Sequence, residues 1–141
     1  MTFPRVLAPI SLALAGACAT PTGSCVSGPK LDGSWHYVGR QDTPERRALD
    51  GTLVLRQQAC GEIAGEIDIA ETGDAGGTRI HGTVTGRIVD ARTVRLDAAI
   101  GAATRQHLAT LAGDSLAGGW LVAGPAGISA TGSFHARRGA P

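Results

Sequence analysis

The sequence has four histidines, the residue type most often used as a metal ligand and as an acid–base catalyst near neutral pH. None of them has another histidine or a carboxylate at the local spacing by which a metal site is recognised. His36, His81 and His135 alternate with apolar residues in short segments, which predicts that they face solvent. For these three and for His107 we expect scattered surface positions, with no metal site and no cofactor.

Other catalytic patterns are equally weak. Ser24, Ser34 and Ser133 each follow a glycine, but none stands in the G-x-S-x-G sequence that exposes a serine nucleophile. Glu66 and Asp68 would share one face of a strand, which is also the ordinary arrangement of a solvated face. The glycine-rich residues 73–77 precede a predicted strand, so they lack the helix N-terminus that phosphate sites use. The sequence therefore predicts no catalytic residues and no enzyme.

The three cysteines are Cys18, Cys25 and Cys60, an odd number that requires an explanation in an exported protein. If Cys18 is modified, Cys25 and Cys60 are free to form a disulfide across 35 residues. The chain-entropy estimate for closing such a loop is about 3–4 kcal/mol, a large share of a small domain's stability. The alternative is that both are free, buried thiols.

The first 17 residues suggest a role for Cys18. Arg5 precedes the apolar residues 6–17, which end in the small trio Ala15-Gly16-Ala17, the layout of a cleaved secretory signal. Followed by a cysteine, this arrangement resembles the bacterial lipobox, which implies acylation of Cys18, as by palmitate, and a membrane anchor. Ala19 after the cysteine implies the outer membrane, facing the periplasm. The lipobox usually carries leucine where this chain has Ala15.

Two other interpretations of the head compete with lipidation. Ala15 and Ala17 also form an A-x-A site, so plain secretion as a soluble periplasmic protein is the alternative. A transmembrane helix is excluded because the apolar stretch is far shorter than about 20 residues and Pro9 interrupts it. We divide the chain into a signal peptide (1–17), a lipidated cysteine with a flexible tether (18–32) and one domain (33–141).

Composition limits the possible partners of that domain. Residues 1–17 contain one charged side chain, Arg5, so the mature chain keeps 12 basic and 12 acidic side chains and is near neutral. The charges are scattered, with no basic stripe of the kind that binds nucleic acid. The chain has 21 glycines, and aliphatic and β-branched residues stand between them. This pattern is typical of many short strands joined by tight turns.

Apolar and polar residues alternate with a period of two in eight segments. We expect strands at residues 33–39, 51–58, 63–71, 78–89, 92–100, 104–112, 116–123 and 128–138. The polar residues 40–50 are predicted to form a loop or a single helical turn. Short connections favour an all-β, single antiparallel up-and-down barrel of roughly eight strands, because closure removes exposed edges; a sandwich is the alternative. The residues expected inside include Ile63, Ile67, Ile80, Val84, Ile88, Leu96, Ile100, Trp120 and Phe134. In residues 128–138, Ile128 and Ala130 alternate in phase with Phe134.

The two ends of this domain resemble lipocalin-like barrels. Gly33-Ser34-Trp35 matches the G-x-W that opens their first strand, and Arg137 or Arg138 stands where such barrels place an arginine over that tryptophan. Alternation favours Arg138, because it shares the inward face with Phe134. The chain is shorter than a true lipocalin and lacks a recognisable C-terminal helix. It is similar to small bacterial lipocalin-like barrel lipoproteins.

Two functions from different classes follow. The resemblance implies a non-enzymatic envelope lipoprotein whose barrel binds a small apolar ligand inside or a protein partner at its rim. The alternative is a periplasmic protease inhibitor of the β-barrel type, in which residues 19–32 would enter a protease cleft. An apolar cavity open at one end would favour the first, and a filled barrel with a protruding N-terminal segment would favour the second.

Overall fold

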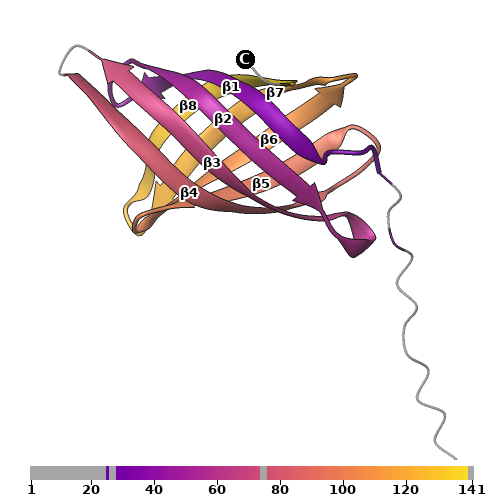
Figure 1. Cartoon of the computed structure of the whole chain (residues 1–141). Helices are drawn as coiled ribbons and strands as arrows, with labels where there is room; N and C mark the ends of the chain where they lie inside the picture. Colours follow the sequence, from indigo (N-terminus) through magenta and orange to yellow (C-terminus); the bar gives the residue numbers. More distant parts are fainter. Residues whose placement is uncertain (1–24, 26–27, 74–75, 140–141) are drawn as a thin grey trace, which may run out of the picture.

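The chain folds into a closed barrel of eight antiparallel strands (Figure 1). The computed structural model describes Cys25 and residues 28–73 and 76–139; the predicted signal peptide and Cys18 lie outside these residues. Each strand pairs with the next along the chain, and the last pairs with the first, so no sheet edge is left open. The strands are β1 (Gly33–Thr43), β2 (Arg47–Gln57), β3 (Glu62–Gly73), β4 (Gly76–Ile88), β5 (Thr93–Ile100), β6 (Ala103–Ala112), β7 (Ser115–Gly124) and β8 (Gly127–Arg138).

All eight predicted strands are present, but the region 40–50 differs from the prediction. It is neither a loop nor a helical turn: β1 continues to Thr43 and β2 starts at Arg47, so three residues connect the two strands. Of the inward positions in this region, Gln41 and Arg47 are polar, and Leu49 is an apolar residue of the core. Because both faces of the strands are polar at this end of the barrel, the contrast that marks a strand in sequence is lost.

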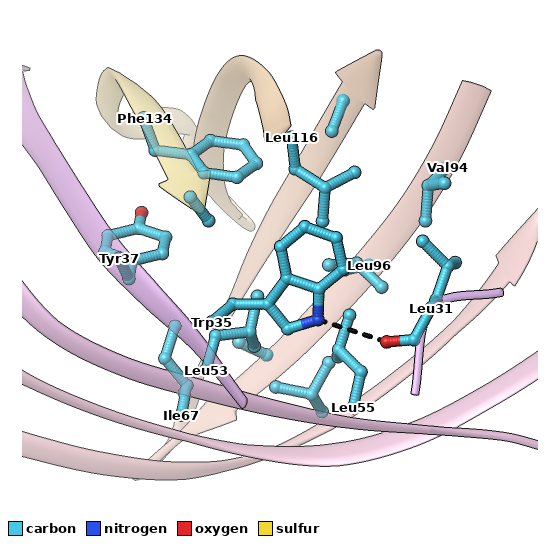
Figure 2. Close-up of a cluster of buried hydrophobic side chains, with 14 of the residues drawn as sticks. Leu31, Trp35, Tyr37, Leu53, Leu55, Ile67, Val94, Leu96, Leu116 and Phe134 are labelled. Carbon is cyan, nitrogen blue, oxygen red and sulfur yellow. Dashed lines mark hydrogen bonds between the residues drawn. The ribbon is translucent and has the colours of Figure 1, made fainter. Parts of the chain in front are cut away.

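The interior is apolar over most of its length. All nine of the predicted interior residues from Ile63 to Trp120 and Phe134 are buried in the core or packed against it. Ile128, which alternation put in phase with Phe134, is 63% exposed instead, because the pairing of β7 with β8 shifts register next to Ala123. Figure 2 shows a part of the core in which buried side chains from several strands surround Trp35.

One end of the barrel, here called the closed end, is sealed by the chain that precedes β1. Leu31 is fully buried there, and its carbonyl oxygen accepts a hydrogen bond of 3.1 Å from Trp35 Nε1 (Figure 2). Gln57 Oε1 accepts a hydrogen bond from the Leu31 amide. The sequence placed Leu31 in a flexible tether, but the structure packs it into the core. An isolated apolar residue among prolines and glycines gives no periodicity from which its burial could be inferred.

A disulfide joins Cys25 to Cys60 at the closed end. Cys60 lies in η1 (Ala59–Gly61), the short 3₁₀ turn that connects β2 to β3. The opposite end, here called the rim, carries the turns that connect β1 to β2, β3 to β4, β5 to β6 and β7 to β8. Within the part of the chain that the structure describes, we find no helix with the length and apolarity to cross a membrane.

Candidate ligand-binding site

The barrel contains two arginine–tryptophan stacks, one at each end. At the closed end the guanidinium carbon of Arg138, on β8, lies 4.4 Å from the centre of the Trp35 ring. This is the closing pair expected from the sequence, with Arg138 as the arginine. Arg137 lies on the outer face and is exposed. Strand pairing explains the geometry, because Trp35 is the direct cross-strand partner of Arg138.

Every donor group of the closed-end stack has an acceptor. Arg138 Nε donates to the carboxylate of Asp114 at 3.1 Å, and its other two nitrogens donate to the carbonyl oxygens of Lys30 and Asp32. The Trp35 N–H is bound by the Leu31 carbonyl. A stack with all of its hydrogen bonds made inside the protein is a structural element that locks the preceding segment onto the barrel.

The second stack lies on the rim side, between β6 and β7. The guanidinium carbon of Arg105 lies 4.2 Å from the centre of the Trp120 ring. Trp120 in turn lies flat against Gly132 of β8, where a Cβ atom would come within 2.4 Å of the indole. Glycine at this position therefore makes the space that the ring occupies, and any side chain would displace it.

Arg105 is held by a carboxylate from the opposite wall of the barrel. Its Nη2 donates to Glu71 Oε1 at 2.7 Å, and both side chains are at least 90% buried. The other oxygen of Glu71 lies 3.9 Å from Arg47 Nη1 at the rim. Arg105 Nε, Arg105 Nη1 and Trp120 Nε1 have no hydrogen-bond partner among the described residues. This stack therefore differs from the closed-end stack, because three of its donor atoms lack a hydrogen-bond acceptor among the described residues.

An aromatic cluster lies close to Arg105. Tyr37 stacks on Phe134 with ring centres 5.2 Å apart, and His107 meets Phe134 edge-on at 5.0 Å. The Tyr37 hydroxyl and His107 Nε2 are 3.3 Å apart and share a hydrogen bond. Burial lowers the pKa of His107 to about 4, with a further contribution from the positive charge of Arg105, so this histidine is neutral at pH 7. Burial also raises the pKa of Tyr37, which keeps its proton.

The prediction of surface positions holds for His36, His81 and His135 and is wrong for His107. His107 is 3% exposed and faces the barrel interior. Sequence reasoning also missed Arg105 and Glu71 as inward residues. A signal was present in β6, where Arg105 and His107 are in phase with Ala109 and Leu111, all four of which are buried. In the described ranges, no group of three or more histidine, cysteine or carboxylate side chains could hold a metal ion.

The middle of the barrel interior is filled, and a hollow lies at the rim. The middle, lined by Tyr37, His107, Phe134 and four aliphatic residues, leaves no room for a water molecule. A hollow of about 430 Å³, here called the rim cavity, lies at the rim over β1, β2 and β3, and its volume is within the range of small-molecule sites. It opens mostly on the outer face of the barrel, because Arg40, Asp42, Ala48 and Thr72 occupy outward positions. Its lining is Arg40, Gln41, Asp42, Arg46, Arg47, Ala48, Thr72 and Gly73.

A second hollow, of about 480 Å³, lies on the outer face of the barrel over β6, β7 and β8. Its outward-facing apolar residues are Leu108, which is 59% exposed, and Leu121. It forms where Gly119 presents no side chain.

Comparison with known proteins supports the architecture. No family model matches the sequence, and no curated protein matches it. Several solved structures do match, and we compare three of them. The fold is what they share with this chain.

The first, EF1p2_mFAP2b bound to DFHBI, has a TM-score of 0.62 and 15% sequence identity, over 77% of this chain and 94% of the other. The second, a de novo designed fluorescence-activating β-barrel, has a TM-score of 0.56 and 17% identity, over 77% and 93%. The third, the redesigned barrel mFAP1 bound to DFHBI, has a TM-score of 0.56 and 16% identity, over 77% and 94%.

Proposed function

We propose that this chain is a non-enzymatic binding protein of the bacterial envelope that takes a small ligand with an apolar body at the rim of its barrel. The observation that carries the proposal is the rim cavity of about 430 Å³, in which Arg40, Gln41, Asp42, Arg46 and Arg47 place polar groups around Ala48, Thr72 and Gly73. A concave space with a few converging polar groups is the usual form of a small-molecule site.

The two halves of the barrel differ in what they can accommodate. The closed-end half is packed with aliphatic and aromatic side chains and supplies stability. The rim half has buried polar groups and adjoining free space, so a ligand would enter there. Two of the structurally similar barrels are bound to the small molecule DFHBI, which supports the same general use of this fold.

Binding without turnover fits the interior chemistry. His107 is neutral, and its Nε2 is engaged with the Tyr37 hydroxyl next to a space that holds no water. A general base must reach the proton it removes, either directly or through one water. Neither group is placed to reach a molecule in the rim cavity.

The proposed anchor is a lipid on Cys18, with the protein facing the periplasm from the outer membrane. The Cys25–Cys60 disulfide accounts for two of the three cysteines, which supports a separate use for Cys18. Replacing it, as in Cys18→Ala, is expected to move the protein from the membrane to the soluble periplasmic fraction, because acyl chains provide the anchoring free energy. A variant that still fractionates with membranes would reject this anchor.

The protease-inhibitor alternative is not retained. It requires the segment before β1 to enter a protease cleft as an extended strand. Instead, Leu31 is buried in the core, and the carbonyl oxygens of Lys30 and Asp32 are bound by Arg138. At least these residues are engaged by the barrel itself.

Titration with the neutral fluorescent probe N-phenyl-1-naphthylamine tests the binding function. We expect saturable fluorescence enhancement that Ala48→Trp, which fills the rim cavity, abolishes. Ala112→Trp is the matched control, because Ala112 is an exposed alanine at the closed-end terminus of β6. Native mass spectrometry of protein isolated from the envelope should show a small-molecule adduct. The absence of both saturable binding and an adduct would refute the proposal.

A further inference from the structure

The hollow on the outer face of β6, β7 and β8, here called the outer hollow, has a projecting side chain directly beside it. Leu108 is 59% exposed, and its cross-strand partner is Gly119, over which the hollow of about 480 Å³ lies. Apart from its chain neighbours, a Cβ atom at Gly119 would meet no atom closer than 3.5 Å, so the space above it is open. A projection and a recess therefore stand next to each other on one surface.

The outer face of β6 and β7, two strands that the structure describes completely, carries no charged side chain. Its residues are Thr104, Gln106, Leu108, Thr110 and Ala112 on β6 and Ser115, Ala117, Gly119 and Leu121 on β7. Each of the other six strands has at least one charged side chain on its outer face, including Arg40, Asp50, Glu66, Arg79, Arg95 and Arg137. Charged residues are depleted at the centre of protein interfaces, because covering them removes their hydration. The pair β6 and β7 is therefore the part of the outer face that another protein covers at the least cost.

We propose that the outer face of β6 and β7 binds a second copy of this chain around a two-fold axis that runs between these strands and along them. Leu108 of each copy then enters the outer hollow of the other. A two-fold interface uses the same patch on both copies, so it requires a projection and a recess on one surface. The interface is independent of the ligand proposed for the rim.

Strand register determines which residues meet across this axis. Because β6 of one copy lies over β7 of the other, each β6 residue faces the β7 residue with which it pairs inside its own barrel. Leu108 therefore faces Gly119, and Thr110 faces Ala117. In both cases a larger side chain meets a smaller one, which lets the side chains of two facing sheets interdigitate.

The flanking strands bring no like charges together. β5 lies beside β6 and β8 lies beside β7, so the axis puts β5 of one copy over β8 of the other. By the same register, Arg95 faces Ser133 of the second copy, and Asp97 faces its Thr131. A charged side chain at the border of the interface thus meets an uncharged hydroxyl, and charge repulsion does not oppose association.

The area of this face predicts a weak dimer. Because a barrel is convex, a second barrel contacts only a few adjacent strands. A face about three strand spacings wide, along strands of 10 residues, covers roughly 500 Å² per copy. Stable complexes bury about 800 Å² per partner. We therefore expect association at high concentration and dissociation on dilution.

The direction of the axis suits a protein held at a membrane. An axis along the strands leaves the two closed ends on the same side of the dimer, since β6 runs the same way in both copies. With the lipid proposed at Cys18, both copies can be anchored in one membrane. Confinement there raises the effective concentration, which compensates for a small interface.

Sedimentation velocity of the mature chain, in its soluble Cys18→Ala form, tests the interface. We expect a monomer at about 1 μM and mostly dimer at about 500 μM. Leu108→Asp places a carboxylate in the interface, and Gly119→Leu fills the hollow, so each should weaken the dimer at least about tenfold. Val38→Asp is the matched control and should associate as the natural chain does, because Val38 is a 44% exposed apolar residue on the outer face of β1.

Cross-linking tests the position of the axis. The two copies of residue 108 lie on either side of it, in sheets about 10 Å apart, so a short bismaleimide should join two chains that carry Leu108→Cys. Cys25 and Cys60 are joined in a disulfide, which leaves one free thiol in the Cys18→Ala form. Val38→Cys should cross-link at least about tenfold more slowly.

Four outcomes would overturn the second-copy interface. They are a monomer at every concentration, unchanged association of Leu108→Asp, equal cross-linking at positions 108 and 38, and a small ligand in the hollow of a monomer. The last would appear as saturable binding of N-phenyl-1-naphthylamine that Gly119→Leu abolishes. Circular dichroism establishes that each variant is folded, and the exposed positions Leu108 and Val38 keep the test decisive if Gly119→Leu does not fold.

Discussion

The two arginine–tryptophan stacks have the same chemistry and opposite surroundings. Arg138 over Trp35 is reached by solvent, yet each of its donors meets a carbonyl or carboxylate supplied by the chain. Arg105 over Trp120 is buried, yet three donors of that pair remain unpaired among the described residues. Evolution of a stable barrel alone would favour the first arrangement at both ends, because unpaired buried donors destabilise the fold. The comparison shows that an arginine–tryptophan pair does not by itself indicate a role. A stack whose donors all have acceptors is structural, whereas a buried stack with unpaired donors is a candidate site.

The largest effect is expected at the closed end. Trp35→Ala removes a fully buried indole and should cost roughly 3–5 kcal/mol, enough to unfold a domain of this size. Urea denaturation midpoints measure the change. His81→Ala, on the exposed face of β4, should stay within about ±0.5 kcal/mol. Equal midpoints for the two variants would mean that the closed-end stack does not hold the barrel together.

Breaking the rim-side ion pair should cost about 3 kcal/mol, as removal of one partner from a buried pair does. Arg105→Met leaves Glu71 buried without its 2.7 Å partner. The double variant Arg105→Met with Glu71→Gln removes both charges, so it should recover most of the lost stability. Thermal unfolding of the single and double variants measures the recovery. A double variant no more stable than the single one would show that the charge of Glu71 is not the source of the cost.

Acid should destabilise the protein through His107. Its pKa is lowered from 6.5 to about 4 in the folded state, so the unfolded chain binds a proton first as the pH falls. Stability is therefore complete above pH 6.5 and declines toward pH 4, by roughly 3 kcal/mol in total. In the His107→Gln variant, the free energy of unfolding should not change between pH 6.5 and pH 4 through this residue. Asp68 and Asp90, whose pKa values are lowered from 3.8, contribute losses only at lower pH. An unchanged slope in the glutamine variant would contradict this source of acid sensitivity.

Two neighbouring arginines provide the smallest effects. Arg138→Met removes hydrogen bonds to two backbone carbonyls and a carboxylate, and should cost about 1–3 kcal/mol. Arg137→Met, one residue earlier on the outer face, should change stability by no more than about 0.5 kcal/mol. Chemical denaturation of the pair compares them directly. A larger loss from Arg137→Met would reverse the assignment of the closing arginine.

Much of the fold could be predicted because the inner and outer faces of most strands differ in polarity. Ile63, Ile67 and Ile69 alternate with Glu66 and Asp68 in β3, and a period of two fixes both the strand and its inward face. The closing stack was implied by the resemblance to lipocalin-like barrels, and the same alternation favoured Arg138 over Arg137, because it puts Arg138 on the side of Phe134. Closure into eight strands followed from short turns, each of which joins neighbours.

Little of the candidate site could be predicted by the same reasoning. Gln41 and Arg105 have polar neighbours on both sides and Glu71 lies between Ala70 and Thr72, so the alternation is weak there, and only the phase of Arg105 with Ala109 and Leu111 in β6 indicated an inward position. Their proximity is a property of barrel closure: Glu71 and Arg105 are 34 residues apart on strands that do not pair. No local pattern encodes such a contact.

The Cys25–Cys60 bond also limits the distance between Cys18 and the barrel, and it determines which end of the barrel lies nearer to Cys18. It fixes the chain to the closed end only seven residues after Cys18. Even fully extended, seven residues span at most about 25 Å. With the lipid proposed at Cys18, the closed end must therefore hang just beneath the bilayer, and the rim cavity must point away from it. The barrel would then collect its ligand from the aqueous periplasm, not from the membrane that holds it.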